Sequence, residues 1–121
     1  YIAALADEII LHPSGNFMFT GLQLTTLFYK GLLDKLEITP QIFRVGRYKS
    51  AVEPFTRYDL SDASKDQYAT LLHTTYSHLL ENLSKDRNIS FAVLHQLAST
   101  LRIIHPEKAY QAQLFTTIGY T

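Results

Sequence analysis

The chain has 121 residues, of which 46% are hydrophobic, and its 11 basic side chains balance 11 acidic ones. This length predicts one compact unit, and the apolar content excludes disorder as the main state. Zero net charge argues against binding to nucleic acid, and the absence of cysteine excludes disulfides, thiolate zinc sites and thiol nucleophiles. The histidines are scattered and the glycines form no phosphate loop, so we expect no metal and no cofactor.

The N-terminal segment is apolar and predicts the end of a helix followed by two short strands. Residues 1–6 are rich in small side chains, as in the last turns of a helix. Residues 9–11 and 17–19 are short apolar runs on either side of a turn at 13–16. The chain starts inside an apolar run with neither a methionine nor a basic segment. We therefore expect it to be a piece of a longer polypeptide, in which any targeting or anchoring segment lies elsewhere.

The middle of the chain predicts a helix, a strand and then a much longer helix. Residues 25–36 carry apolar side chains at helical spacing, and residues 41–45 are of the β-branched and aromatic type that favours strands. Ser61 is a candidate N-cap for a helix that runs to about Asp86. One apolar stripe follows that helix, made by Tyr68, Leu71, Leu72, Thr75, Tyr76, Leu79, Leu80 and Leu83.

Two more helices are predicted in the C-terminal part. Ser90 is a candidate N-cap for a helix over residues 91–101, and Pro106 fits the first position of a short helix that continues to residue 115. Strands that alternate with helices indicate an α/β fold, with parallel strands joined by helical crossovers. Because only about three short strands are visible, we expect part of the sheet to lie outside this chain.

A polar, irregular loop over residues 46–59 follows a predicted strand, and loops in this position often carry function in α/β folds. It holds Lys49 among aromatic and apolar neighbours. A lysine serves as a general base only where burial lowers its pKa, whereas most loop lysines are solvated charges, so the residues alone leave both roles open. Ser50 is a poor partner, because adjacent side chains of an extended segment point to opposite sides. A nucleophile for such a base should therefore come from elsewhere.

Residues 43–57 have the sequence Phe-Arg-Val-Gly-Arg-Tyr-Lys-Ser-Ala-Val-Glu-Pro-Phe-Thr-Arg. This stretch closely resembles the signature of the signal peptide peptidase A family, also called protease IV, whose members are bacterial serine peptidases with a crotonase/ClpP-like fold. The resemblance covers roughly residues 1–90, including residues 1–15, 29–36 and 59–61, and is weak over residues 91–121. It implies that residues 1–121 are part of a single peptidase domain. That part would have a partial crotonase/ClpP-like fold, without the opening strands and the nucleophile segment.

The resemblance also implies a role for the loop lysine. The family uses a Ser–Lys dyad, and Lys49 matches its general base. Residues 50–55 resemble the N-terminal, lysine-bearing half of the family's tandem-domain form. The nucleophilic serine is then expected outside this chain, and the chain alone is expected to be inactive. Candidates for facing the substrate or positioning the loop are Tyr48, Val52 and Phe55. Glu53 and Arg57 are expected to form surface ion pairs that hold the loop, and such pairs contribute about 0–1 kcal/mol.

The function implied by the resemblance is that of a membrane-associated serine endopeptidase that degrades cleaved signal peptides. Its substrates would be apolar signal-peptide remnants, and it would act as a homo-oligomer. Its place would be the bacterial inner membrane, attached through a segment outside this chain, with the catalytic part on the periplasmic side. An alternative is a non-catalytic, crotonase-like assembly module within an oligomer, in which Lys49 is a structural charge. A third possibility, an enzyme acting on acyl-thioesters, finds no support in residues 46–57.

Overall fold

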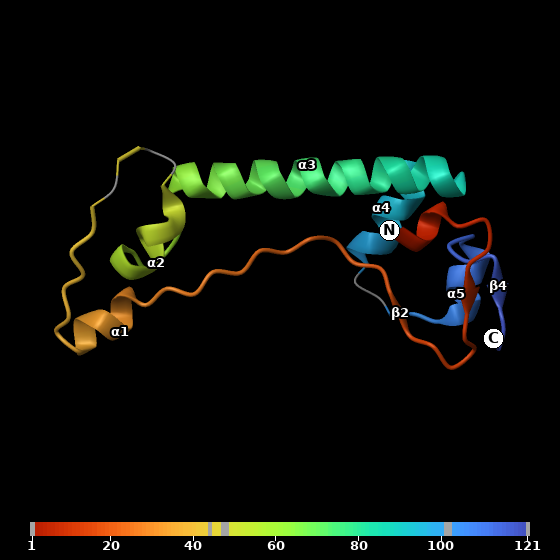
Figure 1. Cartoon of the computed structure of the whole chain (residues 1–121), viewed down its shortest axis with the longest axis horizontal. Helices are drawn as coiled ribbons and strands as arrows, with labels where there is room; N and C mark the ends of the chain where they lie inside the picture. The colour runs from red at the N-terminus through yellow and green to blue at the C-terminus, as the bar shows by residue number, and fades with distance from the viewer. Residues whose placement is uncertain (1, 44, 47–48, 101–102, 121) are drawn as a thin grey trace. The chain divides into compact units, whose positions relative to one another are not determined.

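The computed structural model describes residues 2–43, 45–46, 49–100 and 103–120. Although the length predicts one compact unit, the chain divides into two. Unit 1 comprises Tyr1–Leu22 and Thr75–Thr121, and unit 2 comprises Gln23–Thr74. The long helix α3 (Asp62–Arg87) begins in unit 2 and ends in unit 1, and Figure 1 shows it without a break. The described residues are rich in helix and have few, short strands, which is compatible with an α/β class.

Unit 2 contains three short helical elements ahead of α3. They are α1 (Lys30–Lys35), the 3-10 helix η2 (Ser50–Val52) and α2 (Glu53–Thr56). The helix predicted over residues 25–36 therefore begins later, at Lys30. The strand predicted over residues 41–45 is wrong for its described residues, 41–43 and 45, which form no strand. The described strands all belong to unit 1, and an extended segment without a neighbour gains no ladder hydrogen bonds.

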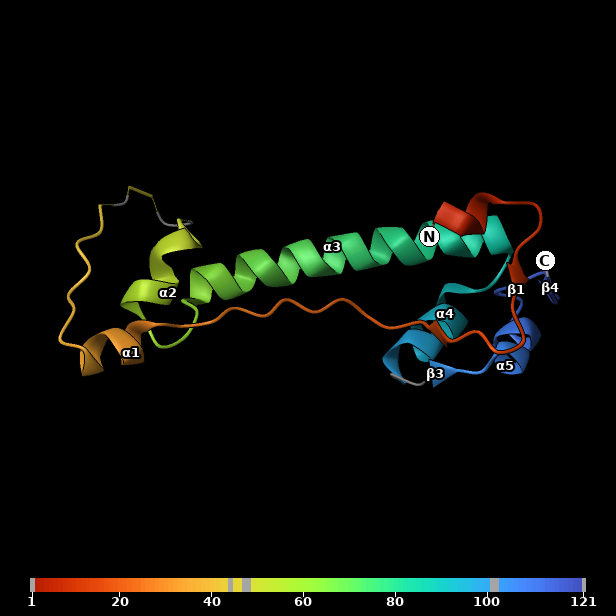
Figure 2. The same cartoon turned by 60° about the horizontal axis from the view of Figure 1, so that its bottom comes forward.

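Unit 1 contains the described strands, each two residues long, together with three helical elements. In chain order these elements are η1 (Ile2–Leu5), β1 (Ile10–Leu11), β2 (Phe17–Met18), α4 (Phe91–Ser99), β3 (Ile103–Ile104), α5 (Pro106–Gln111) and β4 (Thr117–Ile118). Strand β1 pairs in parallel with β4, and the two lie side by side in Figure 2. Strand β2 pairs with β3 in the antiparallel sense, which corrects the expectation of parallel pairing throughout.

The predicted starts of the long helix and of α4 are confirmed. The Ser61 hydroxyl accepts a hydrogen bond from the backbone N–H of Ser64 at 3.2 Å, and the Ser90 hydroxyl accepts one from Val93 at 3.4 Å. These bonds satisfy amides that have no partner inside the first turn of a helix. Pro106 occupies the first turn of α5 as predicted, but that helix ends at Gln111 rather than at residue 115.

The hydrophobic core of the described residues lies in unit 1. It consists of Ala4, Leu80, Leu83, Ile89, Leu94, Ala109 and Leu114. Leu94 of α4 is fully buried, and Leu80 and Leu83 come from the second half of α3. Of the apolar stripe predicted along α3, Leu80 and Leu83 are buried in this half, whereas in unit 2 Leu72 is half-buried and Leu71 is 56% exposed.

Candidate functional site

Lys49 lies at the start of the helical elements of unit 2. It immediately precedes η2, with φ −87° and ψ 71°, and its side chain is exposed. Gly46, three positions earlier, has a φ of 108°, a backbone conformation that favours glycine. Tyr48, a candidate for positioning the loop, lies outside the described residues. The chain therefore turns at a glycine shortly before it presents the candidate base at the N-terminal end of a helical segment.

The residues that follow Lys49 are held by neighbouring elements of unit 2. The Ser50 hydroxyl lies 3.2 Å from the hydroxyl of Tyr68 on α3. The Phe55 ring is stacked on Tyr29, with a centroid distance of 5.6 Å, and the Tyr29 N–H donates to the carbonyl of Pro54 at 2.7 Å. These contacts show how the loop is packed, while a role for Phe55 and for half-buried Val52 in facing substrate remains a prediction.

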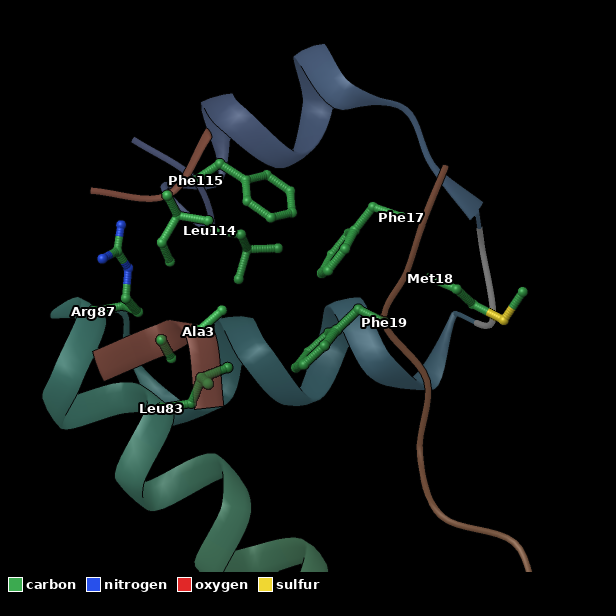
Figure 3. A pocket seen from close by; sticks show the side chains of 10 residues that line it. Ala3, Phe17, Met18, Phe19, Leu83, Arg87, Leu114 and Phe115 are labelled. Carbon is green, nitrogen blue, oxygen red and sulfur yellow. The ribbon is translucent and has the colours of Figure 1, made fainter. Parts of the chain in front are cut away.

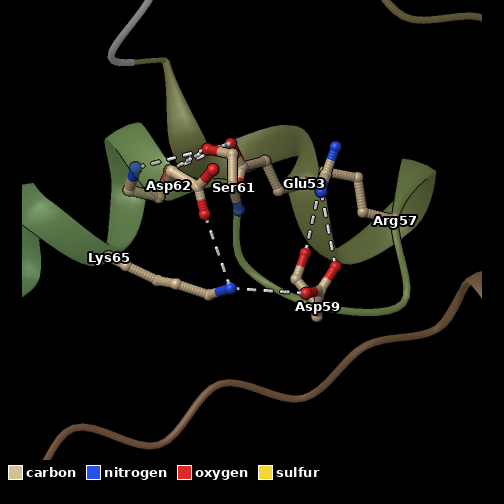
Figure 4. A network of polar contacts seen from close by, with 7 residues as sticks. Glu53, Arg57, Asp59, Ser61, Asp62 and Lys65 are labelled. Carbon is tan, nitrogen blue, oxygen red and sulfur yellow. Dashed lines mark hydrogen bonds and ion pairs between the residues drawn. The ribbon is translucent and has the colours of Figure 1, made fainter.

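Glu53 is the residue whose position differs most from expectation. It was expected in a surface ion pair, but only 1% of it is exposed. Its Oε1 accepts hydrogen bonds from the hydroxyls of Ser61 at 2.6 Å and Ser64 at 2.9 Å. Its Oε2 accepts from the backbone N–H of Ser61 at 3.0 Å. Figure 4 shows this carboxylate directed at the first turn of α3. The positive end of the helix dipole there favours a negative charge.

The Glu53 carboxylate completes a helix cap in an unusual way. In a capping box, the third residue of the helix returns a Glu carboxylate to the backbone N–H of the N-cap residue. Here the third residue is Ser64, which is fully buried, and the carboxylate comes from Glu53 at the start of α2. The cap of α3 is thus also the tie between α3 and the helical segment that follows Lys49. Sequence patterns for helix caps include only residues within one turn of the helix start. They therefore do not detect Glu53, which lies eight positions before Ser61.

The surroundings of Glu53 favour its charged form. Burial by itself raises the pKa of Glu53, but the hydrogen bonds from Ser61 and Ser64 and the positive charge of Arg57 outweigh burial. The pKa of Glu53 therefore lies below its usual value of 4.5. A carboxyl group with a lowered pKa in the folded state contributes stability above its unfolded pKa, and this contribution is lost as the pH falls through the folded pKa.

We predict that the stabilisation due to Glu53 disappears in acid. In the complete protein, Glu53→Gln should reduce hydrogen-exchange protection in the first turns of α3 at neutral pH. The difference from the wild type should shrink once the pH falls below 4.5. Exchange rates corrected for the intrinsic effect of pH provide the measurement. A difference that grows towards acid pH would contradict a charged, hydrogen-bonded Glu53.

Arg57 does form the surface ion pair that was expected of it. Its guanidinium lies 3.4 Å from the Asp59 carboxylate, and the Lys65 amine lies 3.5 Å from the same carboxylate. Figure 4 shows these ion pairs beside the Glu53 network. All three side chains are about half exposed or more, so we assign these pairs little stabilisation.

A second polar cluster joins α1 to the turn before α3. Asp34 accepts hydrogen bonds from the amine of Lys30 and from the hydroxyl of Tyr58. The hydrogen bond from Lys30, with a second from Tyr58, lowers the pKa of Asp34, and the bond to Asp34 raises the pKa of Tyr58. The cluster helps to fix α1 against the segment that carries Glu53.

Unit 1 has an apolar pocket with a volume of about 180 Å³. Side chains around it include Leu83, Leu114, Phe115, Phe17 and Phe19, with Arg87 at its edge (Figure 3). The two terminal nitrogens of Arg87 donate to the Ala6 carbonyl and the Thr116 hydroxyl. The pocket brings together none of the predicted site residues, which all belong to unit 2. Among the described residues, no cluster of three or more His, Asp or Glu side chains is placed to hold a metal ion.

Comparison with known proteins identifies the family. A family model described as peptidase family S49 matches residues 1–121. The chain belongs to this family. The resemblance of the chain to the signal peptide peptidase A, or protease IV, family is thereby confirmed.

Three curated relatives illustrate the similarity. "Protease 4" of Haemophilus influenzae is 45% identical over 89 residues, which cover 74% of this chain and 14% of that protein. "Protease 4" of Salmonella typhi is 41% identical over 90 residues, covering 74% of this chain and 15% of that protein. "Serine protease SPPA, chloroplastic" of Arabidopsis thaliana is 31% identical over 84 residues, covering 69% of this chain and 12% of that protein. The S49 chain thus matches only about a seventh of the length of each of the two "Protease 4" relatives.

In the part of the chain that the structure describes, no helix is both long and apolar enough to cross a bilayer.

Proposed function

We propose that this S49 chain supplies the general base, Lys49, of a serine endopeptidase that works through a Ser–Lys dyad. The observation that carries the proposal is the family match over the whole chain, which includes the Gly-Arg-Tyr-Lys sequence at 46–49. The tethering of the following segment to α3 supports it, since a general base has to be held in a fixed place. The surrounding fold is proposed to be a partial crotonase/ClpP-like domain.

In the proposed reaction, a serine outside residues 1–121 attacks the carbonyl carbon of a peptide bond. Lys49 accepts the proton of the serine hydroxyl and then delivers it to the leaving amine, so that an acyl-enzyme and a free amine result. Water then attacks the acyl-enzyme, and Lys49 takes up and returns the proton in the same way. Because a lysine has to be desolvated to act as a base and Lys49 is exposed here, another part of the complete protein has to cover it.

The proposed substrates are apolar remnants of cleaved signal peptides. We further propose that the complete protein is a homo-oligomer at the bacterial inner membrane, with its catalytic part on the periplasmic side and its membrane attachment outside residues 1–121. Membrane attachment would bring the peptidase close to apolar peptides, which partition into lipid.

Trapping the acyl-enzyme tests whether the nucleophilic serine lies outside residues 1–121 while Lys49 acts as its general base. The complete protein is mixed with an apolar p-nitrophenyl ester and quenched in acid, and the acylated residue is located by peptide mapping. The proposal predicts an acylated serine outside residues 1–121 in the wild type and much less acylation in Lys49→Met. Acylation of a serine within residues 1–121 would contradict it, and so would unchanged acylation of Lys49→Met.

A further inference from the structure

We infer that Glu53 is a positioning residue, which fixes Lys49 by tying the segment that follows it to the first turn of α3. The inference rests on the proposed role of Lys49 as general base. It assigns a function to a buried carboxylate that the reaction itself does not use.

The connection between Lys49 and Glu53 is short. Lys49 immediately precedes η2, and Glu53 both follows η2 and begins α2. The helical segment continues without a loop between them, so a displacement of Glu53 carries the backbone of Lys49 with it. No side-chain contact between Lys49 and Glu53 is needed for this effect.

The tie between Glu53 and α3 consists of buried hydrogen bonds. Three hydrogen bonds of 2.6–3.0 Å join the Glu53 carboxylate to Ser61 and Ser64. All three end on one carboxylate that is 99% buried, so water has little access to replace them when they are lost. Ser50 adds a second contact to α3 at Tyr68, closer to Lys49. The segment from Ser50 to Glu53 is thus held to α3 at both ends.

The tie also depends on the charge of the buried Glu53 side chain. A buried carboxylate is costly unless hydrogen bonds and a positive potential compensate for it. For Glu53, the hydrogen bonds come from Ser61 and Ser64. The positive potential comes from the N-terminus of the 26-residue helix α3. A neutral or shorter side chain would leave donors of the α3 cap without their acceptor. The segment that carries Lys49 would then be free to shift relative to α3.

Glu53 also caps α3, so its removal both frees the segment and destabilises the helix. A double variant separates the two effects. In Glu53→Ala/Ser64→Glu, a Glu stands at the third position of α3, where it can return its carboxylate to the Ser61 backbone N–H as in an ordinary capping box. The cap is restored, but its carboxylate no longer comes from the segment that follows Lys49.

The experiment compares kcat and KM for an apolar quenched-fluorescent peptide in variants of the complete protein. Hydrogen exchange of the α3 amides is measured alongside. Glu53→Ala/Ser64→Glu should regain wild-type protection of α3, while its kcat stays about 10²-fold low with KM little changed. Asp62→Asn is the matched control, because it removes a 98%-exposed negative charge from the same helix end without touching the tie, and it should keep wild-type kcat. Recovery of kcat together with the protection of α3 would overturn the inference.

A second measurement asks whether Glu53 acts through Lys49. If it does, adding Glu53→Ala/Ser64→Glu to Lys49→Met should not lower the residual rate any further, since the group being positioned is already gone. An additional loss of the same size as in the wild-type background would overturn the inference. Should the alanine variants fail to fold, Glu53→Gln replaces them. That variant keeps the size of the side chain but presents an amide to the α3 cap, and wild-type kcat in it would overturn the inference.

The outcome for Lys49→Met separates this inference from the proposed function. If Lys49→Met is inactive and the Glu53 double variant has wild-type kcat, the positioning role fails while the proposed function stands. If Lys49→Met has wild-type activity, the proposed function fails, and the positioning role that rests on it fails too.

Discussion

Replacing Lys49 with methionine in the complete protein should lower kcat for peptide hydrolysis by about 10²–10⁴-fold while KM changes little. Methionine keeps the length and the apolar stem of lysine but has no amine to accept a proton. The loss should fall on kcat, because proton transfer in the transition state disappears while the surface that binds substrate keeps its shape. Steady-state kinetics with an apolar quenched-fluorescent peptide provide the measurement.

Lys35→Met is the matched control for this variant. Lys35 is the last residue of α1, belongs to the same unit and is exposed like Lys49. The same change of charge at this site should leave kcat at the wild-type value. Wild-type kcat in Lys49→Met would contradict the general-base role and would favour a non-catalytic, structural charge.

Replacing Leu94 with alanine should destabilise unit 1 by about 2–5 kcal/mol, the usual cost of truncating a buried leucine. Leu94 is 0% exposed and packs in the cluster that joins α4 to the second half of α3. The truncation removes apolar burial and leaves a cavity that the surrounding residues fill only in part. Hydrogen exchange of the amides in α4 and in the second half of α3 in the complete protein measures the loss.

Val93→Ala is the control for the core variant. Val93 is the neighbouring residue on α4 but is 43% exposed, so truncating it removes little buried surface. Its effect on unit 1 should stay within about 0.5 kcal/mol. Equal effects of the two truncations would contradict the placement of the core.

Helix ends were the features best predicted from the sequence. The caps at Ser61 and Ser90 and the proline at the start of α5 are all confirmed, because capping depends on a few neighbouring residues. The long helix was predicted to within a residue or two from this cap and from its apolar stripe, which is also a local pattern. Pairing of short strands depends on residues far apart in the chain, such as Ile10 and Thr117, and local patterns therefore missed β3 and β4.

The candidate site was predicted in part. Lys49 was singled out through its signature, and the family model matches the chain that contains it, while its role stays a prediction. Glu53 was placed on the surface because charged residues usually lie there, whereas three donors at the start of α3 offset the cost of burying it. That compensation depends on how the chain returns on itself between Glu53 and Ser61, which no local pattern in the sequence specifies.

Chemical rescue of Lys49→Cys tests the central claim most directly. These 121 residues contain no cysteine, so the variant introduces a single thiol into them, and 2-bromoethylamine converts it into a side chain with an amine at the reach of lysine. Lys49→Ala treated with the same reagent controls for thiols elsewhere in the complete protein. The account predicts that Lys49→Cys is inactive, that aminoethylation restores peptide hydrolysis, and that treated Lys49→Ala stays inactive. Full activity of Lys49→Cys before treatment, or no recovery after complete aminoethylation of the folded protein, would contradict it.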